Sequence, residues 1–189
     1  MRQAYQQIAY LWYEVTRMNN RRWWRWISCW FTSSFWAIAS YRLDRFFFLV
    51  FGRYWPPMRV FLSPLFFLTR PWFGQGRCEI HYRANIGRGL RVLHPALGVV
   101  VTAATIAGDN LILAGGNCIG ARRTLKEGDI LIGSNVSLGI NAVILGPIRL
   151  GNNIEISPGA IIVKDAEDGQ TLIAPPAHYL QKNTSQASH

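Results

Sequence analysis

The sequence of 189 residues predicts an α+β protein in which N-terminal helices precede a parallel β-helix of hexapeptide repeats. Two observations predict this arrangement. Aliphatic residues recur at every sixth position through most of the second half, and the aromatic and basic residues are concentrated before that stretch. The composition therefore divides the chain into two unlike parts.

The hexapeptide repeat is the strongest structural signal in the chain. From Ile132 onward, every sixth residue is a branched aliphatic: Ile132, Leu138, Ile144, Leu150, Ile156 and Ile162. The same step passes through six earlier positions: Ile80, Ile86, Val92, Val100, Ile106 and Ile112. A helix repeats about every 3.6 residues and a half-buried strand about every 2, so neither alone explains this period. It is typical of a solenoid of short strands, each pointing one aliphatic side chain inward.

The repeat is interrupted twice. An extension after Val92 contains His94, and a longer insertion between Ile112 and Ile132 contains Cys118 at a position expected to point inward. Insertions in a solenoid leave the stack as loops, and such loops often carry the binding site. We therefore expect the functional site beside these interruptions.

Charge and aromatic content place the boundary between the two parts near "PWFGQGR", where Pro and Gly cluster. Residues 1–77 hold 11 of the 20 basic residues against only Glu14 and Asp44, and they contain every tryptophan and phenylalanine. The predicted parts are a basic, aromatic helical leader (1–76), a β-helix domain (77–180) and a polar tail (181–189).

The leader is predicted to attach to a membrane surface. On a helical wheel, four arginines and three tryptophans lie on opposite sides: Arg17, Arg21, Arg22 and Arg25, and Trp23, Trp26 and Trp30. This pattern is typical of a helix lying at an anionic membrane interface. The longest uncharged run there, 26–41, is shorter than the roughly 20 residues that span a bilayer. We therefore expect a cytoplasmic protein, peripheral to the inner face of the cell membrane.

The composition of the leader also fits two other interpretations. In one, the helices form a soluble domain whose aromatic side chains are buried against partner subunits. In the other, basic and aromatic residues together bind nucleic acid. No nucleic-acid-binding motif is present, and the aromatic residues are too dense for a solvated groove, so no nucleic-acid partner is expected.

The cysteines and histidines limit the kinds of site that the chain can form. Cys29, Cys78 and Cys118 are odd in number and widely spaced, which fits neither a disulfide framework nor a zinc site and favours a reducing compartment. No metal is expected. Among the four histidines, only His94 lies in an interruption of the repeat. A general base needs a group that orients it, and Glu79 lies nearly one coil of about 18 residues before His94.

Three segments carry a resemblance to a known family: "CEIHYRANIGRGLRVLHPALGVVV", "ILAGGN" and "ILGPIRLGNNIEISPGAIIVKD". Over residues 77–180 they resemble the serine O-acetyltransferase branch of the hexapeptide-repeat acyltransferases. This resemblance implies a left-handed β-helix, a homotrimer and acetyl-CoA as acetyl donor. It implies His94 in "VLH" as the catalytic base and Glu79 as its supporting carboxylate. The positions implied for acetyl-CoA contacts are Gly120, Ala121, Gly139, Ile140 and Ser157.

Two residues that depart from the family's pattern suggest which molecule accepts the acetyl group. Asp129 stands where the family has a second histidine that helps hold the amino acid, and Leu93 replaces the aspartate before the catalytic histidine. Exopolysaccharide and capsule O-acetyltransferases resemble the same branch. We therefore predict acetyl transfer to a hydroxyl of a sugar in polysaccharide or lipid-linked oligosaccharide biosynthesis, with His94 as general base. The alternatives are a serine O-acetyltransferase of cysteine biosynthesis and an inactive, membrane-docked trimeric scaffold.

Overall fold

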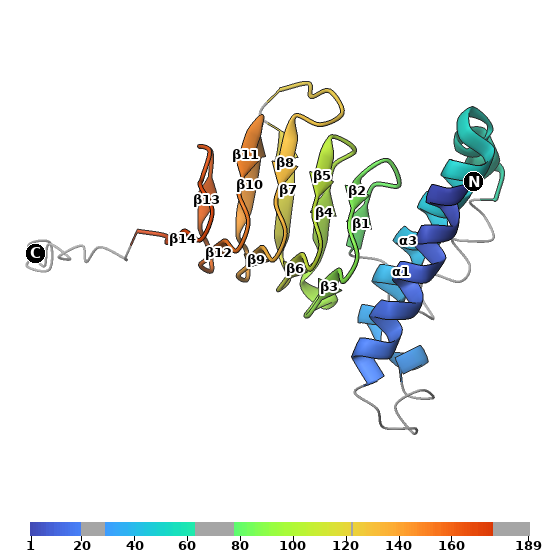
Figure 1. Cartoon of the computed structure of the whole chain (residues 1–189), viewed down its shortest axis with the longest axis horizontal. Helices are drawn as coiled ribbons and strands as arrows, with labels where there is room; N and C mark the ends of the chain where they lie inside the picture. Colours follow the sequence, from blue (N-terminus) through green and yellow to red (C-terminus); the bar gives the residue numbers. More distant parts are fainter. Residues whose placement is uncertain (20–28, 63–77, 122, 176–189) are drawn as a thin grey trace, which may run out of the picture.

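The computed structural model describes residues 1–19, 29–62, 78–121 and 123–175, and it has the predicted order of helices followed by a parallel β-helix. Figure 1 shows the coils stacked side by side, with the two long helices across the end of the stack that begins with β1. The described part of the C-terminal end lies at the opposite end of the stack.

The leader contains two long helices, α1 (Arg2–Asn19) and α3 (Ser33–Phe51). Short 3₁₀ helices follow the gap after α1 and the end of α3, at Cys29–Phe31 and Gly52–Tyr54, and residues 55–62 are again helical. Thr32 begins α3 because its Oγ1 accepts a hydrogen bond from the Phe35 backbone N–H. Gly52 ends α3 with a φ of 54°, a conformation that glycine adopts without steric cost.

The strands form three parallel sheets, one on each side of the β-helix. The first sheet contains β1 (Cys78–Ile80), β4 (Val99–Val101), β7 (Asn117–Ala121), β10 (Val143–Gly146) and β13 (Ile161–Ile162). The second contains β2 (Asn85–Ile86), β5 (Thr105–Ala107), β8 (Ile130–Ile132) and β11 (Ile148–Leu150). The third contains β3 (Arg91–Val92), β6 (Ile112–Leu113), β9 (Ser137–Leu138), β12 (Glu155–Ile156) and β14 (Thr171–Leu172).

The core runs along the axis of the β-helix and is built from the predicted aliphatic positions after Ile132. Leu138 and Ile144 are fully buried, and Leu150 and Ile156 nearly so. Strand pairing aligns equivalent residues of successive coils, so each aliphatic side chain packs on the one above it. This stacking confirms the hexapeptide repeat in the second half of the chain.

The predicted register is wrong by one residue between the two interruptions. The inward residues there are Val101, Ala107, Leu113 and Ile119, in place of the predicted Val100, Ile106, Ile112 and Cys118. The reason is that the extension containing His94 is one residue longer than the spacing from Val92 to Val100 suggested. Cys118 consequently lies on the outward face of the first sheet, between Val100 and Val143.

One corner of the stack is held by a ladder of asparagines. The Asn110 side chain donates to Asn135 (2.9 Å), and the Asn135 side chain donates to Asn153 (3.0 Å). All three have a φ between 57° and 60°, a left-handed conformation that asparagine tolerates better than most residues. Arg17 of α1 donates to Asn110 (2.9 Å) and so connects the leader to the first rung of the ladder.

The leader shares its core with the first coil. Ile38 and Tyr41 of α3 belong to the same buried apolar cluster as Ile86. The Tyr41 hydroxyl donates to the carbonyl of Ala84 (2.8 Å) and accepts from the backbone N–H of Ile86 (3.1 Å). Helix α3 therefore closes the open end of the solenoid.

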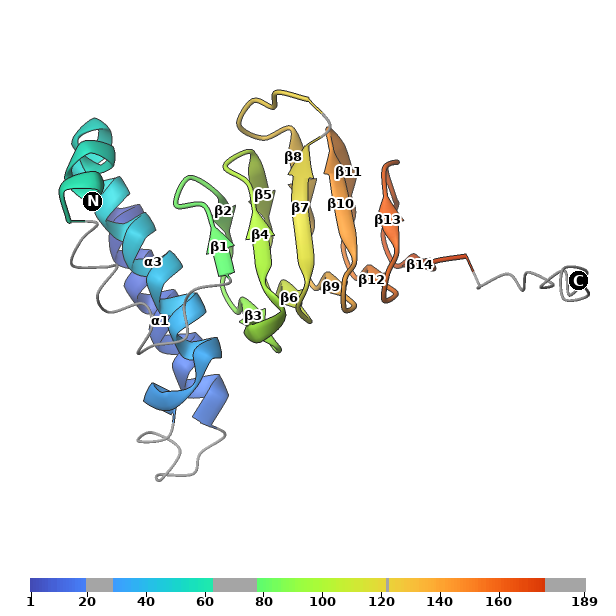
Figure 2. The ribbon, with the colours of Figure 1, turned by 180° about the vertical axis from the view of Figure 1, so that it is seen from behind.

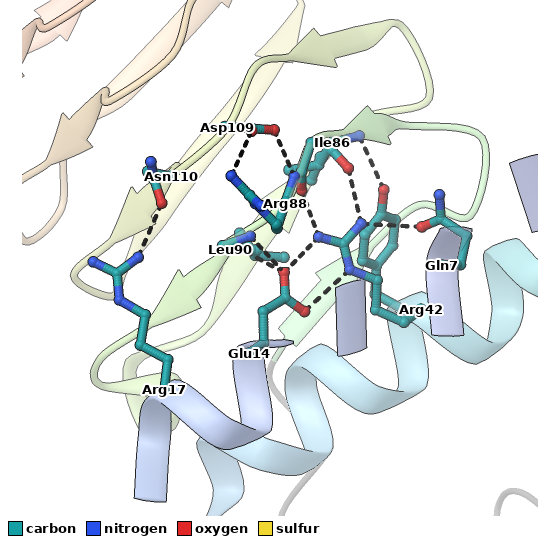
Figure 3. A network of polar contacts seen from close by, with 12 residues as sticks. Gln7, Glu14, Arg17, Arg42, Ile86, Arg88, Leu90, Asp109 and Asn110 are labelled. Atoms are coloured by element: carbon teal, nitrogen blue, oxygen red, sulfur yellow. Dashed lines mark hydrogen bonds and ion pairs between the residues drawn. The ribbon is translucent and has the colours of Figure 1, made fainter. Parts of the chain in front are cut away.

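A buried ion pair completes this contact, as Figure 3 shows. Glu14 of α1 and Arg42 of α3 lie 2.6 Å apart and are almost fully buried. The Glu14 carboxylate also accepts from the backbone N–H groups of Gly89 and Leu90 (3.1 and 2.9 Å). Burial raises the pKa of Glu14, and the Arg42 guanidinium opposes this increase. The remaining Arg42 donors bond to three oxygens of Gln7, Ile86 and Gly87.

The structure covers only part of the predicted interfacial helix. Arg21, Arg22, Arg25, Trp23 and Trp26 lie outside the described residues. Of the other two, Arg17 is near the end of α1, and Trp30 lies in a separate 3₁₀ helix. Within the described ranges, no helix combines the length and apolar character needed to cross a bilayer.

Candidate active site

His94 lies at the corner where the chain leaves β3 in the third sheet and enters β4 in the first. Its backbone N–H donates to the carbonyl of Ala114 on the next coil (3.0 Å), and its carbonyl accepts from Leu97. A short 3₁₀ helix, Pro95–Leu97, fills the extension. The His94 side chain is exposed, so the extension presents an imidazole to solvent on an otherwise regular wall.

The next coil packs directly against His94 at Gly115. Gly115 has a φ of 128°, and a Cβ there would lie 2.6 Å from the His94 carbonyl oxygen. A larger residue would require both coils to move. Gly115 therefore allows the close approach that sets the position of His94.

The buried side chain of Asn117 stabilises this corner through hydrogen bonds, a role that was not predicted from the sequence. Its side chain is 1% exposed. The amide oxygen accepts from the N–H of Gly115 (2.8 Å), and the amide nitrogen donates to the carbonyls of Gly139 and Ala142. The N–H of Gly116 donates to another residue, Gly98 (2.6 Å). The N–H groups of both glycines are therefore engaged within the corner.

Glu79 lies in β1, with its exposed side chain on the outward face of the first sheet. Its neighbour Cys78 donates from Sγ to the Pro95 carbonyl (3.5 Å), so β1 runs beside the His94 extension. Burial raises the pKa of Cys78, which keeps the thiol protonated as a donor. Among the residues that the structure describes, no hydrogen bond or ion pair joins Glu79 to His94. Glu79 lies at the start of the first coil and His94 at its end.

His81 follows on the same strand edge and is already engaged. Its Nδ1 accepts from the backbone N–H of Arg83 (3.1 Å), and its ring stacks on Tyr82 at 4.4 Å. Burial lowers the pKa of His81, the positive charges of Arg59 and Arg83 lower it further, and Glu79 opposes them. His81 is therefore a neutral, packed side chain, in contrast to the exposed His94.

The residues predicted for acetyl-CoA contacts fall into two groups. Gly139 and Ile140 follow β9 and Ser157 follows β12, so they lie at the same corner as His94 on later coils. Gly120 and Ala121 lie at the far end of β7, beside the end of β10. The first sheet therefore separates the two groups.

Glycine is required where these coils meet. A Cβ on Gly139 would lie 2.5 Å from the backbone nitrogen of Pro158 on the next coil. Ser157 Oγ accepts from the N–H of Ala174 (2.8 Å), which secures the last corner. The surface beside His94 is therefore a stack of tight corners with little side-chain bulk.

The two departures from the family pattern also have clear positions. Leu93 is partly exposed beside His94, and its N–H donates to the carbonyl of Leu113 (2.9 Å). Asp129 lies at the end of the insertion, where its carboxylate accepts from the backbone N–H of Lys126 (2.8 Å). Over the described ranges, no cluster of histidine, cysteine, aspartate and glutamate is arranged to hold a metal ion.

N-terminal helices followed by a parallel β-helix are also the fold of the solved structures to which this chain is similar. Solved structures similar to this chain include serine acetyltransferases. The Neisseria gonorrhoeae enzyme in complex with serine is 25% identical with a TM-score of 0.69, covering 94% of this chain and 72% of that one. The soybean apoenzyme is 23% identical, with a TM-score of 0.70 and coverages of 91% and 68%.

A third similar structure, the Brucella abortus serine acetyltransferase, is 23% identical with a TM-score of 0.67, covering 92% of this chain and 68% of that one. No family model and no curated protein matches the chain. The structural matches confirm the predicted fold class, N-terminal helices followed by a left-handed parallel β-helix.

These comparisons overturn the predicted sugar acceptor. The similarity to serine acetyltransferases covers almost the whole chain, so it includes the helical leader as well as the β-helix. The prediction of a polysaccharide O-acetyltransferase gave weight to Leu93 and Asp129 and did not recognise the leader as part of the serine acetyltransferase fold. The leader instead belongs to the shared fold, which favours the alternative of a serine O-acetyltransferase.

Proposed function

We propose that the protein is a serine O-acetyltransferase that transfers an acetyl group from acetyl-CoA to the hydroxyl of L-serine. The observation that carries this proposal is the exposed imidazole of His94, positioned by Gly115 at a corner of the serine acetyltransferase fold. The similar Neisseria gonorrhoeae enzyme was crystallised with serine, which supports this amino acid as the acceptor.

In the proposed reaction, His94 accepts the proton of the serine hydroxyl while the oxygen attacks the thioester carbonyl. The carbon–sulfur bond then breaks, and the imidazolium returns its proton to the departing thiolate. Glu79, at the start of the same coil, is proposed to favour the imidazolium through its negative charge, as a carboxylate does beside a catalytic histidine in other enzymes. Hydrogen bonds of this kind are often long before substrate binds.

The proposed acetyl-CoA site and the proposed homotrimer involve the same surface. Gly139, Ile140 and Ser157 line the corner next to His94, and Gly120 and Ala121 lie across the first sheet. Between these groups, the outward face of that sheet presents an apolar column: Val100, Cys118, Val143 and Ile161. Packing another copy against this column would bury it and bring the far edge of one subunit toward the His94 corner of another.

The acceptor is tested by incubating the purified protein with acetyl-CoA and L-serine and following free thiol release and O-acetylserine formation. We expect release to depend on serine, and glucose in place of serine to give only the rate without acceptor. Thiol release that serine does not increase would overturn the proposal. Complete inactivity that is the same with and without His94 would instead support the inactive scaffold.

Gly115 offers a test of how closely the corner must hold His94. In Gly115→Ala, the new Cβ would displace His94, and we expect kcat to fall about tenfold or more, because about 1 Å of misplacement can cost about a hundredfold. Gly169→Ala is the matched control. Gly169 also has a positive φ, of 76°, but nothing lies within 4 Å of a Cβ there. Equal loss of activity in both variants would show that the corner does not position His94.

A further inference from the structure

One face of the helical leader is apolar and exposed. Tyr5, Ile8 and Trp12 recur at helical spacing along α1, and Leu43 and Val50 do so along α3. Tyr5 and Trp12 are 66% and 64% exposed. We call these five residues the outer helix face. The Tyr5 ring contacts the ring of Phe46 on α3 at 6.4 Å, which joins the two parts of the face.

The outer helix face points away from the solenoid. On α1, Glu14 and Arg17 bond to the first coils and lie on a different side of the helix from Ile8 and Trp12. On α3, the side chains that contact the coil, including Arg45, lie opposite Val50. Figures 1 and 2 show the helix pair as a layer across the end of the stack, with its other side away from the coils.

The charge of the leader complements an anionic surface. Its only two acids are both paired, Glu14 with Arg42 at 2.6 Å and Asp44 with Arg59 at 3.1 Å. Other arginines are exposed, including Arg2 and Arg53. The leader therefore presents an excess of positive charge near an apolar, aromatic face.

We propose that the outer helix face docks on the anionic lipid surface of a membrane, on its cytoplasmic side. Exposed aromatic rings suit the boundary between headgroups and acyl chains, and each basic residue near an anionic leaflet contributes about 1 kcal/mol. A second copy of the leader fits less well, because it carries the same positive charge and has both of its acids already paired.

The test is cosedimentation of the full-length protein with vesicles of phosphatidylcholine, alone or mixed with phosphatidylglycerol. We expect the protein to pellet with the mixed vesicles and to be partly released at high salt, because salt screens surface attraction. In Ile8→Gln combined with Trp12→Gln, the apparent affinity should fall about tenfold or more, because less apolar surface is buried in the interface. Both side chains are exposed, so the variant should keep the wild-type melting temperature.

Ile173→Gln is the matched control, because Ile173 is 77% exposed on the last coil, at the far end of the molecule. It should bind the mixed vesicles as the wild type does. A wild-type protein that stays in the supernatant would overturn the proposal, and so would undiminished binding by the double variant. If the wild type shows no vesicle binding and the double variant has a lower oligomer mass in solution than the wild type, the face is a contact between copies of the chain.

Discussion

Replacement of His94 by alanine is expected to lower kcat for acetyl transfer to serine by about a hundredfold or more, the usual contribution of a general base. The imidazole is the proton acceptor in the proposed reaction, and no other exposed histidine lies at this corner in the described chain. The measurement is steady-state thiol release from acetyl-CoA at saturating serine. Glu79→Gln should lower kcat less, because Glu79 acts through His94.

The His94→Ala variant should fold normally, because the side chain is exposed and only the backbone of His94 is bonded to the next coil. Its melting temperature and its affinity for acetyl-CoA should match the wild type. His81→Ala is the control for loss of a nearby histidine, and it should retain activity because His81 is engaged by Arg83 and Tyr82. Near-normal turnover without His94 would contradict the proposed mechanism.

The β-helix was predictable because its stabilising contacts repeat at short sequence intervals. One inward aliphatic per strand produces a pattern in the sequence itself, as from Ile132 to Ile156. The register between the interruptions was not predictable in this way. Val100 and Val101 are both valines, as Cys118 and Ile119 are both apolar, so composition could not decide which residue of each pair points inward.

The candidate site was likewise predictable only in part. His94 was predicted because it interrupts a regular repeat, and such an interruption can be recognised from the sequence alone. The role of Asn117 was not, because its partners at Gly139 and Ala142 belong to the next coil and are set by strand register. The glycines of the corner were visible in the sequence, but the contact between Gly115 and His94 depends on how the extension folds.

The leader shows where composition was misleading. Its many arginines and aromatic residues suggested a separate, surface-attached part, but Arg42, Arg45 and Tyr41 are buried against the first coil. Buried arginines of this kind depend on partners far away in sequence, such as Glu14 and the carbonyl of Ile86. The membrane proposal therefore depends on the aromatic and basic residues of the leader that are exposed.

The second large effect is expected at the buried ion pair. Arg42→Ala should lower the free energy of unfolding by about 3–5 kcal/mol, the usual result of leaving one member of a buried pair without its partner. The substitution also removes hydrogen bonds to the carbonyls of Ile86 and Gly87. Guanidinium denaturation at fixed protein concentration measures the change. Arg59→Ala is the control, because its pair with Asp44 is partly exposed and should contribute less than about 1 kcal/mol.

The loss in Arg42→Ala should also depend on pH, because it is caused by a buried carboxylate. Burial raises the pKa of Glu14 in the folded wild type, and Arg42 holds it down. Without Arg42, the folded protein binds a proton on Glu14 at a higher pH than the unfolded chain does, so lowering the pH stabilises the variant relative to wild type. We therefore expect a smaller deficit near pH 5 than near pH 8. Adding Glu14→Gln should recover part of the stability at pH 8, because a neutral amide costs less to bury than an unpaired carboxylate. A deficit that does not change with pH would show that packing of the Arg42 side chain is responsible.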